Sequence, residues 1–187
     1  RSGMMEGLDE SFDAAIFIGY HAKAGSPSGV FAHTGSGVVR DVRVNGTSLG
    51  EGGLNTMVAA WYGVPVVLVT GDDVAVRQVA ETARGARTVA VKRAINPRAV
   101  ELRPFAVVHR EIEEAAYEGV RDAKKIAPQR ATTYQVEVQF NNIAIPEVAQ
   151  NLPQMSRPAP DTIAFTADSM PKAYTLIRLL YRYINPD

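Results

Sequence analysis

The run of elements between residues 64 and 95 most constrains the fold of this chain. VPVVLVTG (64–71) is an unbroken apolar strand-like segment, and RTVAVKRAI (87–95) is a second one. Between them, DDVAVRQVAETA (72–83) has the spacing of a helix that opens on two aspartates. Strands that are apolar on both faces and alternate with helices are typical of a largely parallel sheet covered on two sides. We therefore predict an α/β fold.

Elements before and after this run extend the pattern. AAIFIGYH (14–21) is typical of a buried strand, and GVVRDVRVNGTSLG (37–50) predicts a strand that ends at an Asn-Gly turn. The spacing of apolar residues further predicts helices at about 50–62, 103–125, 145–152 and 170–184, strands at 132–140 and 162–168, and a loop at 157–160. We expect a largely parallel or mixed sheet flanked by helices, with a C-terminal strand–helix extension.

Composition narrows the classes of protein that are possible. A chain of 187 residues usually makes one domain, so residues 1–187 are expected to form a single α/β domain. The 20 basic and 20 acidic side chains balance, which argues against a nucleic-acid partner. No apolar stretch approaches the roughly 20 residues that cross a bilayer, so we expect no membrane partner. The absence of cysteine excludes disulfides and fits a cytoplasmic protein.

Two of the three histidines flank a loop of small residues that follows the first predicted strand. His21 ends that strand, and His33 lies at the far end of the loop. In an open α/β sheet, ligands gather at the carboxyl ends of the strands, so this position favours a functional role for His21. Imidazole is also a common ligand for zinc. The alternative is that both are ordinary loop histidines, hydrogen-bonded to backbone or water.

Glu51 begins the helix predicted at about 50–62, at the edge of its apolar stripe. A carboxylate at the edge of a buried face needs a partner, and Glu51 and His21 are two ligand types that suit zinc. The alternative is that Glu51 interacts only with the N-terminus of its own helix. Asn55 lies one turn later on the same side. It can donate to a ligand or a substrate carbonyl, or else bond to nearby backbone.

Two strand-to-helix junctions have the composition of a phosphate-binding or nucleotide-binding loop. GEGG (50–53) and VTGDD (69–73) suggest phosphate or nucleotide binding, but GEGG matches neither the G-x-G-x-x-G nor the Walker pattern. We assign these glycines to close packing or turn geometry. Asp72 and Asp73 are expected to cap the helix that follows them.

Several blocks of sequence, taken in order, resemble one known family. They are MMEGLDESFDAAIFIGYHAKAGSPSGVFAHT (4–34), NGTSLGEGGLNTMVAAWYGVPVVLVTGDD (45–73), AVKRAI (90–95), VEVQFNN (136–142) and MPKAYTLIRLLYR (170–182). They resemble the dinuclear-zinc D-aminopeptidases of the dipeptide-transport operon type. The resemblance runs over nearly the whole chain.

This resemblance assigns roles position by position. It implies that His21 of G-Y-H-A and Glu51 of G-E-G-G-L-N are zinc ligands, and that His33 of F-A-H-T is the catalytic histidine, acting as nucleophile or acid/base. It implies hydrolysis of short peptides with an N-terminal D-amino acid, at two zinc ions that polarise the scissile carbonyl and activate water. Asn55 remains a candidate for substrate binding. The resemblance also implies a ring-like homo-oligomer.

The family's other metal ligands, an Asp-x-Glu pair and a further histidine, lie upstream of the matched blocks. They have no counterpart in residues 1–187. His21 and Glu51 cannot hold two ions, because catalytic zinc takes about three protein ligands per ion. We therefore expect this chain to be the C-terminal part of a longer D-aminopeptidase-like protein whose upstream part pairs with it. The competing hypothesis is a non-catalytic or incomplete binding or scaffold module of the same fold.

Overall fold

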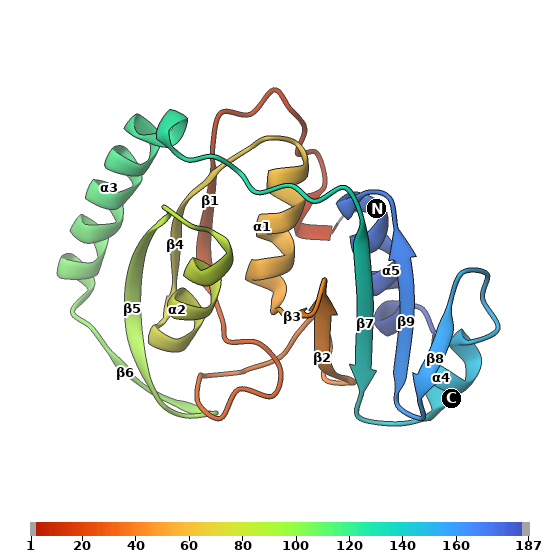
Figure 1. The fold of residues 1–187 in the computed structure, drawn as a ribbon. Helices are drawn as coiled ribbons and strands as arrows, with labels where there is room; N and C mark the ends of the chain where they lie inside the picture. The colour runs from red at the N-terminus through yellow and green to blue at the C-terminus, as the bar shows by residue number, and fades with distance from the viewer. Residues whose placement is uncertain (1–2, 185–187) are drawn as a thin grey trace.

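The first of two sheets contains the predicted parallel strands. The computed structural model describes residues 3–184 and is drawn in Figure 1. Strands β1 (Ala15–Tyr20), β4 (Val66–Asp72) and β5 (Arg87–Asn96) pair in parallel, and β6 (Ala99–Leu102) pairs antiparallel with β5. All seven residues of β4 are buried, because the strand is central and covered on both faces. The prediction of a mixed α/β sheet is confirmed.

Helices cover the two faces of this sheet. Figure 1 shows α3 (Phe105–Arg121) on one face, and α1 (Glu51–Trp61) and α2 (Asp73–Thr82) on the other. Gly119 allows α3 to approach closely, since a Cβ there would lie 2.7 Å from the carbonyl oxygen of Val67. Short 3-10 helices occur at Gly3–Met5 and Ala123–Lys125. No helix within residues 3–184 has both the length and the apolar character of a membrane span.

The C-terminal part of the chain forms a second, antiparallel sheet. Its strand order is β3-β2-β7-β9-β8. The strands are β2 (Val39–Val44), β3 (Thr47–Ser48), β7 (Tyr134–Phe140), β8 (Ser156–Ala159) and β9 (Thr162–Ala167), and the helices beside them are α4 (Ala144–Ala149) and α5 (Met170–Arg182). The predicted C-terminal strand–helix extension is thus part of a sheet that also contains β2, from the first half of the chain.

One element of this sheet corrects the sequence analysis. Residues 157–160 were expected to be a loop, but β8 occupies Ser156–Ala159 and pairs with β9. Pro158 is compatible with this strand because β8 lies at the edge of the sheet, where one side of the backbone needs no partner.

A single buried core joins the two sheets through α1. Figure 1 shows α1 between them. Leu54 and Val58 of α1 belong to the same buried cluster as Val69 of β4, Val138 of β7 and Ile177 of α5. Because α1 is packed on both sides, the position of its first residue, Glu51, is tightly fixed.

Candidate metal centre

A bulge at the end of β1 redirects the chain toward α1. Gly19 has a φ of 76°, which favours glycine, and the pairing with β4 is irregular between Phe17 and Tyr20. Tyr20 therefore stacks on Phe17, with ring centroids 4.7 Å apart. Gly52 of α1 makes room for this ring, since a Cβ there would lie 3.0 Å from it. The next residue, His21, then meets the start of α1.

Backbone contacts bring the second histidine back beside the first. The amide of His33 donates to the carbonyl of Ala22 over 3.1 Å, and the amide of Ala24 donates to Oγ1 of buried Thr34 over 3.1 Å. The two segments therefore run side by side. The imidazole rings of His21 and His33 stack with centroids 3.9 Å apart and planes 13° from parallel.

The carboxylate of Glu51 completes a cluster of three donors. Its Oε2 lies 3.0 Å from Nε2 of His21 and 3.5 Å from Nε2 of His33. One donor atom from each side chain lies within 4.8 Å of the other two. The side chain of His33 is the most exposed, at 42%, while that of Glu51 is 16% exposed. The structure thus brings together the three residues singled out in the sequence, and their roles remain predictions.

The cluster is electrostatically paired. Burial lowers the pKa of the His21 imidazole, but the hydrogen bond to Glu51 and the charge of that carboxylate outweigh burial and raise it overall. Burial likewise acts to raise the pKa of Glu51, yet the contact with His21 and the amide of Gly35 bring it below its ordinary value. Glu51 is therefore a carboxylate at neutral pH, which is the form that binds a cation.

Asn55 lies outside this cluster. It is completely buried on α1, and its Nδ2 donates to the hydroxyl of Tyr20 over 2.7 Å. Its Oδ1 has no hydrogen-bond partner within residues 3–184. The alternative of a bond to nearby backbone does not hold for this nitrogen, because its partner is the phenol of Tyr20 on β1. A role for Asn55 in substrate binding remains a prediction.

The residues that suggested phosphate binding have structural explanations. The carboxylate of Asp72 accepts from the amides of Val74 and Ala75 over 2.8 and 3.0 Å, so Asp72 caps α2 as predicted. Asp73 does not cap α2, because its Oδ1 accepts from the amide of Ala94 over 2.8 Å. A Cβ on Gly52 would lie 2.3 Å from Val79, and one on Gly53 would lie 2.8 Å from Leu49. These glycines therefore serve close helix packing, as the sequence analysis proposed.

Gln78 of α2 is a residue that the sequence analysis missed. Its Oε1 accepts from the amide of Lys23 over 2.9 Å, and its Nε2 donates to Oγ of Ser26 over 2.8 Å. Gln78 thus holds the turn that begins two residues after His21. No local pattern marks this glutamine, because its partners lie more than 50 positions away in the sequence.

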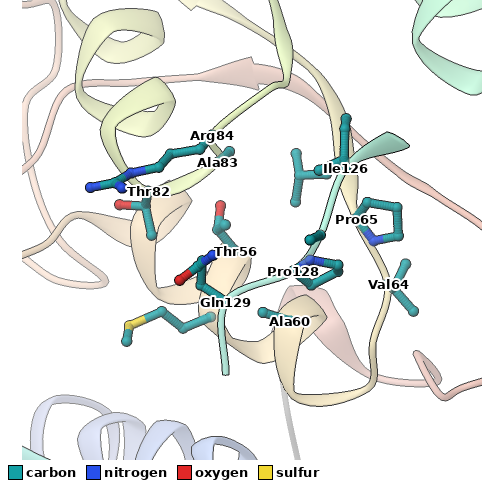
Figure 2. A pocket seen from close by; sticks show the side chains of 13 residues that line it. Thr56, Ala60, Val64, Pro65, Thr82, Ala83, Arg84, Ile126, Pro128 and Gln129 are labelled. Carbon is teal, nitrogen blue, oxygen red and sulfur yellow. The ribbon is translucent and has the colours of Figure 1, made fainter. Parts of the chain in front are cut away.

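An apolar pocket lies apart from the cluster (Figure 2). It has a volume of about 100 Å³ and is formed by the second half of α1, the entry to β4, the end of α2 and residues 126–129. Figure 2 shows Thr56, Ala60, Ile126 and Pro128 among the residues that line it. The pocket adjoins the amino end of β4, whereas the cluster follows the carboxyl end of β1. It shares no residue with the cluster.

Comparison with known proteins agrees with this fold. A family profile described as D-aminopeptidase matches residues 1–179. A curated D-aminopeptidase of Bacillus subtilis (strain 168) is 35% identical over 173 residues, which are 91% of this chain and 63% of the relative. A solved structure, the Zn-dependent D-aminopeptidase DppA from Bacillus subtilis, described as a self-compartmentalizing protease, has a TM-score of 0.89 at 33% identity.

The similarity covers almost all of this chain and a smaller share of its relatives. It includes 95% of this chain and 65% of the solved chain. The chain therefore spans somewhat less than two thirds of the length of these relatives. Within that span, the family profile, the identity and the fold agree, and the chain belongs to the D-aminopeptidase family.

Proposed function

We propose that this chain forms the larger part of a zinc-dependent aminopeptidase, which hydrolyses short peptides that begin with a D-amino acid. The convergence of His21, His33 and Glu51 from three separate segments carries this proposal. Histidine nitrogens and glutamate oxygens are ligands that zinc prefers, and in this cluster these atoms face one another. The name of the Bacillus subtilis relative supports zinc as the metal and a peptide as the substrate.

His21 and Glu51 are proposed as the zinc ligands. Their facing atoms, Nε2 and Oε2, are 3.0 Å apart and now hydrogen-bond each other. Each carries a lone pair that a cation can take once the shared proton leaves. When bound, zinc supplies an activated water and polarises the scissile carbonyl.

His33 is proposed to move the proton or to attack the carbonyl. It is the most exposed member of the cluster, so a substrate can reach it. Its Nδ1 lies 2.7 Å from the carbonyl oxygen of Phe31. A carbonyl oxygen only accepts, so Nδ1 donates in that contact, and Nε2 is directed toward the cluster, where proton transfer or attack would take place.

The proposed site holds two zinc ions and takes its other ligands from upstream sequence. Within residues 3–184, the cluster offers three donors, which is too few for two ions. We therefore propose that residues 1–187 form a single α/β domain and that this domain is the C-terminal part of a longer chain.

The variant His33→Ala tests the proposed function. We expect it to abolish release of D-alanine from D-Ala-D-Ala and to leave zinc content unchanged, since His33 is not a proposed ligand. Glu51→Gln serves as the matched variant and should lose zinc. Turnover of the L,L-dipeptide gives the stereochemical comparison. Less than one zinc per chain in the full-length protein, with no turnover of any dipeptide, would instead favour a scaffold module.

We further propose that the protein assembles with copies of itself in the cytoplasm. The relative described as self-compartmentalizing supports assembly. Large apolar side chains at the β5–β6 hairpin and the start of α3 are also exposed to solvent and suit such an interface, namely Ile95, Leu102 and Phe105.

A further inference from the structure

Phe31 has an unusual backbone conformation close to the cluster. Three non-glycine residues within 3–184 have a positive φ, and they are Phe31, Asn45 and Gln154. Asn45 belongs to an Asn-Gly turn, where asparagine tolerates this region well. Phe31, with a φ of 49°, has a bulky side chain that is poorly suited to it. A strained residue beside a proposed catalytic group suggests a role for the strain.

Burial of the aromatic ring does not account for this conformation. Phe31 is 68% exposed, so its ring gains little from packing. The residues on either side are fixed instead. Val30 is buried, and the amide of His33 is bonded to Ala22. The backbone between these two anchors must turn sharply, and Phe31 supplies the turn.

Both backbone groups of Phe31 have partners. Its amide donates to the carbonyl of Pro97 over 3.0 Å, and its carbonyl lies 2.7 Å from Nδ1 of His33. Pro97 lies in the turn of the β5–β6 hairpin, where the side chain of Asn96 accepts from the amide of Arg98 over 2.9 Å. The hairpin tip is thus braced by its own hydrogen bond and holds Phe31 from the other side.

We propose that Phe31 is a positioning residue for His33, an inference that rests on the proposed function. The left-handed backbone turns the carbonyl of Phe31 toward Nδ1 of His33. A carbonyl can only accept, so Nδ1 donates in this contact, and the contact orients the imidazole of His33 with Nε2 on the side of Glu51. The backbone conformation, and not the aromatic ring, is the property that matters.

This distinction can be tested with variants that all lack the ring. Glycine and asparagine adopt a positive φ readily, alanine less so, and valine poorly. We expect Phe31→Gly and Phe31→Asn to keep kcat for D-Ala-D-Ala within about threefold of the parent. Phe31→Val should lower kcat about tenfold or more, because a misdirected general base loses much of its effect, with a smaller change in KM. Phe31→Ala should be intermediate, and it replaces the valine variant if that protein does not fold.

A second readout does not depend on activity. The ¹⁵N chemical shifts of the ring nitrogens report which nitrogen of each histidine carries the proton, and His109 on α3 gives an internal reference. In the full-length protein, His33 should show a protonated Nδ1 in the parent and in Phe31→Asn. It should show a mixture of tautomers in Phe31→Val.

The outcomes separate this inference from the proposed function. Equal loss of activity in all ring-less variants, with an unchanged tautomer, would assign the effect to the aromatic side chain and overturn the inference. A parent protein without peptidase activity would overturn the proposed function, while the tautomer measurement would still decide the role of Phe31.

Discussion

At the scale of the residue, the pairing of Tyr20 and Asn55 shows how a buried polar group supports the site. Asn55 is one helical turn from Glu51, and its amide holds the hydroxyl of the residue that precedes His21. A buried hydrogen bond of this kind is worth about 1–3 kcal/mol when one partner is removed and the other is left unpaired. Asn55 therefore links the start of α1 to the end of β1.

The variant Asn55→Ala should accordingly destabilise the protein. We expect the free energy of unfolding to fall by about 1–3 kcal/mol, because the Tyr20 hydroxyl loses its partner and a small cavity forms. Tyr20→Phe, which removes the other half of the pair, should have a similar effect. Urea denaturation measures both. An unchanged unfolding transition together with a raised KM would show instead that Asn55 contacts the substrate directly.

At the scale of the element, helix α2 organises the loop that contains both histidines. Gln78 is the contact point, because it accepts from the backbone of Lys23 and donates to Ser26. The hydroxyl of Ser26 in turn donates to the carbonyl of Lys23 over 2.8 Å, which closes the turn on itself. The position of His21 thus depends on a helix that contributes none of the three clustered donors.

Gln78→Leu should therefore weaken zinc binding without touching a ligand. The half-buried amide of Lys23 would lose its acceptor, at a cost of about 1–3 kcal/mol in unfolding free energy, and the loop would hold His21 less firmly. Gln78→Glu retains an acceptor and should lose less. Competition with a chelator measures zinc affinity in the full-length protein. Equal affinity in the parent and the leucine variant would contradict this role.

At the scale of the whole molecule, β1 lies at an edge of the first sheet, and within residues 3–184 it pairs only with β4. Ile16 and Ile18 on this strand are 40% and 61% exposed, and an exposed apolar edge strand invites pairing with another strand. Met4 and Phe12 line an open groove beside the same strand. We propose that sequence upstream of this chain covers this edge and brings the missing metal ligands.

Amide hydrogen exchange tests that proposal. The amides of β1 that have no partner on the β4 side should exchange slowly in the longer protein and much faster in residues 1–187 alone, since only the longer protein would pair both sides of β1. The amides of the central strand β4 serve as the control and should be protected in both. Equal exchange along β1 in the two proteins, or a native protein that consists of one 20.2 kDa species, would contradict the proposal.

The local features of this protein can be predicted from its amino-acid sequence. The apolar run of β4, the aspartate cap of α2 and the amphipathic helices follow from periodicity and capping, which act over a few residues. The sequence also marked His21, His33 and Glu51 as candidates. Only the tertiary structure shows that these three side chains converge on one point. The same is true of the separate antiparallel sheet, of strand β8 and of the contacts of Gln78 and Phe31. These features depend on packing between segments that lie far apart in the chain, and such packing leaves no pattern in the local sequence.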